Sequence, residues 1–496
     1  MSLFIKKPLE QLLQMSTDPT KGLKRTLGAG NLVALGIGAI IGAGLFVRTA
    51  AAAGQHAGPA VTLSFIFAAI GCAFAGLCYA EFASMIPVAG SAYTYAYVTM
   101  GEFVAWIIGW ALVLEYALGA ATVSIAWSEF LNKLVGGAIP YQWSHSPFEA
   151  LQIADGTLIH GIMNIPALFI LLLLSLLLIK GTQESAIVNT IIVIIKVSIV
   201  VIFIAVGWQF INPANHTPYL IPADAQPALL PNGDYYSYEG IRNHGWFGVL
   251  AGAGIVFFAF IGFDAISTAA QESKNPKKDM PIGILGSLVI CTVLYILFSY
   301  VLTGVAPYTD FIRAGKEASV AYAIDTYMPG YGWLSKLIQV AILAGFSSVM
   351  LVMLMGQSRV FYSMANDGLL PKVFSVLHPK FRTPYKSNLI LFVFVGAFGS
   401  FVPGDVTGDL TSIGTLFAFV LVCAGVLIMR KANPTAVRSF KTPWVPVVPI
   451  LGMIICTLMI IGLDRVTQMV ALSWLLFGLI IYFSYSKRNS LLRKNP

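Results

Sequence analysis

Two ionisable side chains stand in stretches of the sequence that are otherwise apolar. Lys196 interrupts the run IIVIIKVSIVV at residues 191–201, and Glu115 interrupts the run WALVLEY at residues 110–116. A charged group at the centre of a lipid bilayer costs about 3 kcal/mol or more unless it is paired or solvated. Such residues are functional by default, and a lysine can escape the penalty by releasing its proton.

A lysine that is charged in one state and neutral in another can carry a proton. We therefore predict that Lys196 couples proton movement to transport, against the alternative of a permanently charged lysine that only holds helices together. Glu115 is the second candidate for proton coupling. Its carboxylate could face a cavity, where it would bind a cationic substrate or pair with Lys196, or it could pack among helix ends near the inner surface.

Backbone chemistry is expected in the first apolar segment, residues 31–53. Its glycines are Gly36, Gly38, Gly42 and Gly44. Each glycine inside a helix costs about 1 kcal/mol relative to alanine, so the helix unwinds most easily at residues 42–44. The freed backbone groups are tolerated in a membrane where they line a polar cavity. There the N–H groups suit a carboxylate and the carbonyls suit an ammonium, whereas the alternative role of the glycines is close helix packing.

The sixth apolar segment, residues 246–271, is interrupted as well. Gly262 lies near its middle, and Asp264 follows within the span. If the chain holds two repeats of five segments, the first and the sixth occupy corresponding positions. Interrupted segments at corresponding positions indicate the central binding site of a transporter. This pairing favours a site for an amino acid zwitterion over close helix packing alone.

These residues must be positioned by membrane-spanning helices. The chain is 57% hydrophobic and only 10% charged, whereas soluble domains carry about 25% charged residues. We predict an all-α membrane protein, because a spanning helix needs about 20 mostly apolar residues. Twelve segments qualify, at about 31–53, 60–82, 94–126, 162–180, 188–211, 246–271, 282–305, 332–365, 388–403, 409–429, 446–463 and 468–485.

The distribution of charge predicts the orientation. With an even number of segments both termini share one side, and most lysines and arginines outside the segments fall on that side. Cytoplasmic loops retain such an excess, so both termini are predicted to be cytoplasmic. The longest loops, about 127–161 and 212–245, then lie outside, where they could fold as short lids.

Several classes of function are disfavoured by the sequence. The net charge of +8 is spread among many loops and forms no single patch, which argues against nucleic-acid binding. There is no G-x-x-x-x-G-K-[ST] motif, so transport energy is expected from an ion gradient or from exchange. We expect no enzyme activity, cofactor or metal site, because the buried ionisable groups form no catalytic set or ligand cluster.

Four stretches resemble the amino acid–polyamine–organocation superfamily, and its cationic amino acid transporter branch with bacterial homologues fits best. They are GIGAIIGAGLF at 36–46, YAEFASMIPVAGSAYTY at 79–95, FFAFIGFDA at 257–265 followed by ESKNP at 272–276, and the stretch 359–371. The resemblance implies two inverted five-helix repeats, helices 1–5 and 6–10, with helices 1 and 6 broken. The implied divisions are a cytoplasmic segment 1–30, repeats at 31–211 and 246–429, two further helices at 446–485, and a cytoplasmic tail 486–496.

The resemblance also implies the roles of individual residues. The substrate carboxylate would meet the N–H groups of Ala43 and Gly44, and the Phe258 ring would close over the substrate as a gate. Lys196 would take the place of a bound sodium ion beside the first-helix break. The implied substrate-binding residues are Ile40, Ile41, Gly42, Ala43, Gly44, Phe258, Ala259, Phe260 and Ile261.

Two further residues of the sixth helix have structural roles by the same resemblance: Gly262 as the break, and Asp264 as an acid that caps freed N–H groups. The sequence departs from the family at Ala43, where many relatives carry Ser or Thr, and at Arg48, where relatives are commonly apolar. Arg48 is open to the simple interpretation that it lies at the outer membrane surface.

The function implied is secondary active transport of amino acids through the cell membrane by alternating access. Lys196 favours proton-coupled symport of small neutral and/or cationic L-amino acids. An amino acid exchanger of the same fold is the alternative, and a transporter-like sensor is a third. The partners expected are the amino acid, protons and membrane lipid, with an accessory subunit left open.

Overall fold

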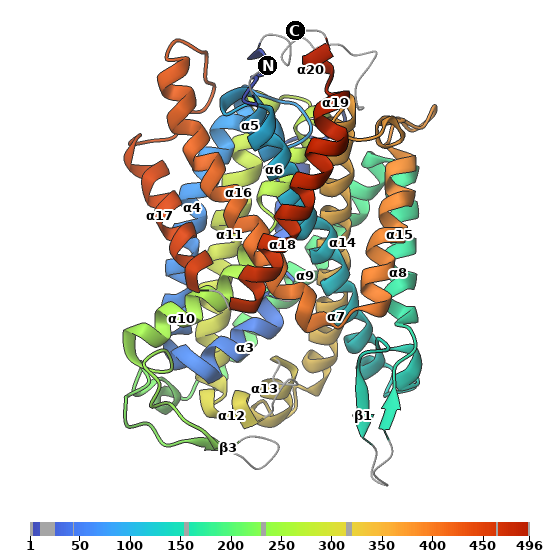
Figure 1. Cartoon of the computed structure of the whole chain (residues 1–496). Coiled ribbons are helices and arrows are strands. Elements are labelled where there is room, and N and C mark those ends of the chain that lie inside the picture. The colour runs from blue at the N-terminus through green and yellow to red at the C-terminus, as the bar shows by residue number, and fades with distance from the viewer. Residues whose placement is uncertain are drawn as a thin grey trace.

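The computed structural model describes residues 3–9, 25–42, 44–152, 158–229, 235–313, 320–462 and 465–494. Ala43, one of the predicted substrate-binding residues, lies outside the described residues. Most of the described chain is helical, and the long helices stand side by side (Figure 1). Both termini lie at one end of this bundle, which we call the terminus end; the opposite end is called the loop end.

The elements alternate long helices with short π and 3₁₀ turns. The longer helices are α2 (Ala29–Ile40), α4 (Val61–Met85), α5 (Ala92–Thr99), α6 (Glu102–Val113), α7 (Gly119–Leu134), α8 (Ile165–Lys180), α9 (Thr182–Gly207), α10 (Gly245–Phe257), α11 (Pro276–Val305), α13 (Val320–Tyr327), α14 (Gly332–Asn366), α15 (Tyr385–Phe401), α16 (Gly404–Ala432), α17 (Val447–Gly462) and α18 (Arg465–Ile481). The short α-helices are α3 (Thr49–Ala52), α12 (Tyr308–Arg313), α19 (Lys487–Asn489) and α20 (Leu491–Lys494).

The short turns join these helices. The π turns are η1 (Gly44–Arg48), η2 (Ala53–Ala57), η4 (Leu114–Leu118) and η12 (Tyr482–Ser486). The 3₁₀ segments are η3 (Gly58–Ala60), η5 (Tyr141–Trp143), η6 (Trp208–Phe210), η7 (Pro213–His216), η8 (Phe258–Phe260), η9 (Asp264–Glu272) and η11 (Lys372–Ser375). Two small antiparallel hairpins pair β1 (Ala150–Gln152) with β2 (Leu158–His160) and β3 (Ala228–Leu229) with β4 (Tyr235–Tyr236).

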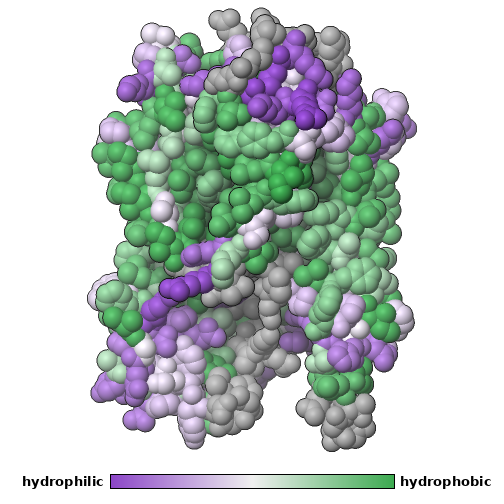
Figure 2. Space-filling view, viewed as in Figure 1, coloured by the Kyte–Doolittle hydropathy of each residue, from purple (hydrophilic) through white to green (hydrophobic). Residues whose placement is uncertain are grey.

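The helices are built for a bilayer. Eight helical stretches among the described residues are at least 18 residues long and apolar enough to cross a membrane, and four more apolar helices are shorter. Large apolar side chains such as Ile194 on α9, Val293 on α11 and Leu458 on α17 are exposed on their outer faces. Figure 2 shows the result as a hydrophobic belt between two polar ends. Lipid is the solvent that such a surface requires.

Two predicted segments differ from the observed elements. The predicted third segment, 94–126, starts as a separate helix, α5, and the chain turns at Gly101 before α6 begins. Gly101 has φ 99°, a left-handed conformation that favours glycine and ends a helix. The gap predicted between the first two segments is bridged by η2 and η3, with a turn at Gly58, φ 59°.

The predicted long loops lie at the loop end. The 127–161 connection carries β1, and the 212–245 connection carries β3 and leads into α10 (Figure 1). The short helices α12 and α13 lie beside them. The two predicted loops thus carry small hairpins at the end opposite the termini, and their role as lids stays a prediction.

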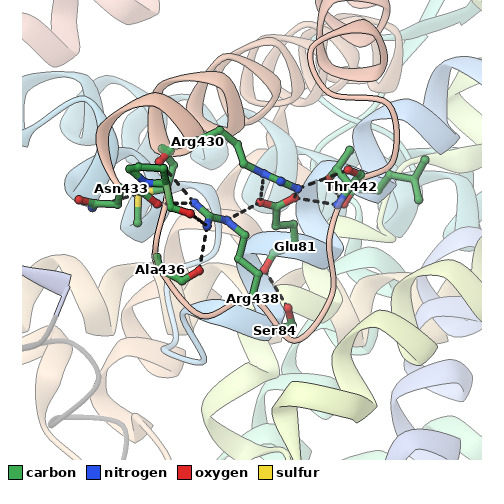
Figure 3. A network of polar contacts seen from close by, with 10 residues as sticks. Glu81, Ser84, Arg430, Asn433, Ala436, Arg438 and Thr442 are labelled. Atoms are coloured by element: carbon green, nitrogen blue, oxygen red, sulfur yellow. Dashed lines mark hydrogen bonds and ion pairs between the residues drawn. The ribbon is translucent and has the colours of Figure 1, made fainter.

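A network of ion pairs fixes the terminus end. The Glu81 carboxylate at the end of α4 accepts hydrogen bonds from Arg430 of α16 at 2.9 Å and from Arg438 of the following loop at 3.1 Å. The Thr442 backbone N–H donates to the same carboxylate at 2.8 Å. Figure 3 shows both guanidinium groups directed at Glu81. A single buried acid thus ties α4 to α16 and to the loop before α17.

The two arginines of this network are not equally buried. The Arg438 side chain is 3% exposed, whereas that of Arg430 is 27% exposed. We expect Arg438→Gln to lower the free energy of unfolding by about 3 kcal/mol, because it removes one partner from a buried ion pair. Arg430→Gln is the matched control and should cost about 1 kcal/mol or less, because its pair is partly solvated. Thermal unfolding in detergent measures both, and an equal or larger effect at Arg430 contradicts this account.

Candidate substrate site at two helix breaks

The first helix break follows α2. The α-helix ends at Ile40, and Ile41 takes an extended conformation with φ −78° and ψ 103°. Helical structure resumes at Gly44 with the π turn η1. The helix therefore stops just before residues 42–44, the stretch at which the sequence predicts unwinding. The carbonyl groups of residues 38–41 consequently lose their partners in the next helical turn and face the protein interior.

The second break follows α10. The helix continues as the 3₁₀ turn η8, Ile261 is extended with ψ 136°, and Gly262 has φ 114° before η9 begins. A side chain at Gly262 would be strained by this φ, and its Cβ would lie only 2.7 Å from the Cβ of Ala39. The second helix is therefore broken at Gly262. Only glycine fits there, for two reasons: the positive φ angle and the close approach of Ala39.

The two breaks touch one another. A Cβ placed on Gly44 would lie 2.2 Å from Cα of Ala259. The Tyr295 hydroxyl, from α11, lies 2.8 Å from the Ile40 carbonyl oxygen and 2.9 Å from the Ala259 carbonyl oxygen. It can donate its one proton to either carbonyl. Carbonyls from both breaks therefore converge on one point. The sequence did not reveal this, because Tyr295 is one of several hydroxyl side chains along α11 and nothing local distinguishes it.

Lys196 lies at the first break. Its Nζ donates hydrogen bonds to the carbonyl oxygens of Gly38 at 2.9 Å and Ile41 at 2.7 Å, and to the Ser348 hydroxyl at 2.7 Å. The Ser348 hydroxyl in turn donates to the Gly38 carbonyl at 2.8 Å. An ammonium has three donors, and these three acceptors satisfy all of them although the side chain is fully buried. Lys196 thus joins α9 and α14 to the end of α2.

Glu115 and Asp264 form a second buried polar cluster. Glu115 lies on the π turn η4 and is fully buried, with its carboxyl beside that of Asp264. The Tyr116 hydroxyl donates to Asp264 Oδ2 at 2.5 Å, at the start of η9. Glu115 does not pair with Lys196, whose three donors are directed to other groups. The structure therefore brings Glu115 to the second break and Lys196 to the first.

The remaining predicted residues surround the breaks. Ile41 and Phe260 are buried, and the Phe260 ring packs edge-on against Tyr295 with centroids 5.2 Å apart. A Cβ on Gly42 would meet the Val349 side chain of α14 at 2.6 Å. The Phe258 ring, at the start of η8, is half-buried and lines a cavity of about 500 Å³.

Comparison with known proteins identifies the family to which this arrangement belongs. The profile described as "Amino acid permease" matches residues 27–484. The chain belongs to the amino acid permease family. It is 43% identical to a branched-chain amino acid permease of Bacillus subtilis, with 99% of each chain covered, and 39% identical to a methylthioribose transporter of the same organism, with 99% and 100% covered. It is 34% identical to the vacuolar cationic amino acid transporter 4 of Arabidopsis thaliana, over 88% of this chain and 68% of that one.

Membership of this family confirms the superfamily resemblance drawn from the glycine and aromatic motifs. The relatives are transporters rather than enzymes, so this permease is a membrane protein of secondary amino acid transport. The two breaks are consequently the place to look for substrate recognition, since they bring together, in the interior of the bundle, backbone carbonyls that bond to side chains and not to a next helical turn.

The contact between the breaks can be tested by adding one methyl group. Gly44→Ala would force Ala259 and the η8 turn away from η1, an overpacking that costs about 1 to 3 kcal/mol. We expect amino acid uptake by proteoliposomes to fall by about tenfold or more, because the carbonyls and N–H groups no longer converge. Gly286→Ala on α11 is the control, since its Cβ would make only ordinary contact, 3.4 Å from Val33. Equal uptake by both variants would count against a shared site.

Proposed function

We propose that this permease is a proton-coupled symporter of small neutral and/or cationic L-amino acids that works by alternating access. The observation that carries the proposal is the position of Lys196: a fully buried ammonium holds the unwound end of one broken helix. A group that can exist charged or neutral, placed at the substrate site, links proton binding to the shape of that site.

The substrate would bind as a zwitterion between the breaks. The N–H group of Gly44, at the start of η1, suits the carboxylate, because the N-terminus of a helical segment carries partial positive charge. Ala43, which lies outside the described residues, is proposed as the second N–H donor. The ammonium would bind carbonyls at Ile40, Phe258, Ala259 and Ile261, replacing the Tyr295 hydroxyl as the donor to one or more of them. Phe258 would close over the substrate as the gate.

Proton transfer would act through hydrogen bonding at the first break. The protonated Lys196 has three donors for its three acceptors, and the neutral amine has two donors and a lone pair. Loss of the proton would turn one of these donors into a lone pair. The Ser348 hydroxyl would then have to give up its bond to the Gly38 carbonyl in order to donate to the amine, which weakens the link between α2 and α14. Glu115, beside Asp264 at the second break, is the second proton-coupling group of this proposal.

The fold proposed is twelve spanning helices, with inverted repeats at 31–211 and 246–429 followed by two helices at 446–485. The contacts of the broken helices support it. At the terminus end, Leu27 accepts a hydrogen bond from the Lys274 N–H at 2.8 Å, so the start of α2 lies beside the end of η9. Near the loop end, a Cβ on Gly248 of α10 would lie 2.2 Å from the His56 carbonyl. The broken helices therefore run in opposite directions, as inverted repeats require.

The proposed location is the cell membrane, with 1–30 and 486–496 on the cytoplasmic side. The terminus end carries the excess of lysine and arginine that marks the cytoplasmic face. The proposed partners are the amino acid, protons and lipid.

A transport panel tests the proposed function. Purified protein in proteoliposomes should accumulate labelled amino acids when an inward proton gradient is imposed, without any amino acid inside. A requirement for internal amino acid would show the exchanger instead. Because one relative is named for methylthioribose, that compound belongs in the panel, and its uptake in place of amino acids would overturn the proposal.

Substitution of Lys196 tests the coupling. Lys196→Met keeps the length of the side chain and removes its charge, so uptake should no longer respond to an imposed pH gradient. Tyr295→Phe is the matched control at the same site. It removes one hydrogen bond of about 1 kcal/mol and should lower uptake by about fivefold while the response to the gradient persists. A full gradient response in Lys196→Met would eliminate this residue as the coupling group.

A further inference from the structure

Arg48 lies on the first broken helix just past the substrate site. It ends the π turn η1, four residues after Gly44, and its guanidinium carbon lies 5.6 Å from the centroid of the Phe258 ring. A guanidinium at this distance from an aromatic face makes a favourable cation–π contact. The side chain is half-buried and lies over the ring of the proposed gate, while its position at the outer membrane surface stays a prediction.

Arg48 and Phe258 both line one cavity. Its volume is about 500 Å³, and its walls come from α4, α10, α16 and α17. Apolar side chains such as Ile70, Leu250 and Leu416 form most of the lining, and Ile70 and Leu250 are themselves exposed, so the cavity opens at the surface of the bundle. Both charged groups among the described lining residues are positive, Arg48 and Arg242, and no described lining residue is acidic.

Low-dielectric walls focus the field of a charge into a cleft, and this cleft reaches the surface at the exposed Arg242, where ions can enter it. An amino acid with a neutral side chain enters as a zwitterion with no net charge. Its carboxylate and ammonium feel opposite forces that largely cancel. Lysine or arginine brings one extra positive charge, which Arg48 repels. Two unit charges about 10 Å apart, at an effective dielectric constant of about 20, repel strongly enough to weaken binding about tenfold.

We propose that Arg48 is a specificity-determining residue that rejects amino acids with cationic side chains, so that this permease carries neutral amino acids. This inference rests on the proposed transport function and narrows its substrate class. Arg48 acts at the approach to the Phe258 gate, before the zwitterion reaches the backbone groups of the two breaks.

The test uses pairs of amino acids that differ by one charge. Norleucine and lysine have similar side-chain length, as do citrulline and arginine, and each compound competes against labelled leucine in proteoliposomes. For the intact protein we expect lysine and arginine to inhibit at least about tenfold more weakly than their neutral partners. Arg48→Gln should reduce the difference in inhibition between the cationic and the neutral amino acid of each pair to about twofold. Arg48→Lys keeps the charge and should preserve this difference.

Salt gives a second readout that a purely structural role of Arg48 would not change. Raising the ionic strength should narrow the gap in the intact protein and in Arg48→Lys, because screening weakens the repulsion. If Arg48→Gln does not fold, this salt dependence in the intact protein decides the matter. Equal inhibition by lysine and norleucine, a gap that persists in Arg48→Gln, or a gap insensitive to salt would overturn the proposal. Absence of transport of every amino acid would instead overturn the proposed function.

Discussion

Backbone groups that leave a helix inside a membrane must find new partners, and in this permease a single ammonium meets that requirement. Lys196 donates to the carbonyls of Gly38 and Ile41, where α2 stops. A buried charge and unpaired carbonyls are each unfavourable alone. Together they form three hydrogen bonds that offset both costs.

The surrounding helices are arranged to serve the two breaks. From α11, Tyr295 joins the carbonyls of Ile40 and Ala259, and from α14, Ser348 completes the shell of Lys196. Farther toward the terminus end, the bundle is tied by fully buried charge, with Arg359 of α14 and Glu272 of η9 2.9 Å apart. The loop side of the gate is a cavity with apolar walls.

Much of this arrangement could be predicted from the sequence, for local physical reasons. Glycine clusters weaken a helix wherever they occur, so the breaks near Gly42 and at Gly262 could be located without a structure. A lysine in an apolar run had to have polar partners, and Lys196 lies where the resemblance placed it. Tyr295 and Ser348 could not be singled out, because one hydroxyl in a long apolar helix has many ordinary explanations. The tight contact of Gly44 with Ala259 depends on how distant helices pack, which no local pattern encodes.

The ratio of protons to amino acids that enter proteoliposomes together tests the central claim most directly. A pH-sensitive dye inside the vesicles and a labelled amino acid outside would be followed in the same preparation. If Lys196 carries a proton in each transport cycle, the interior acidifies with about one proton per amino acid, since one titrating group moves one charge. Accumulation of amino acid with no accompanying acidification would contradict the account.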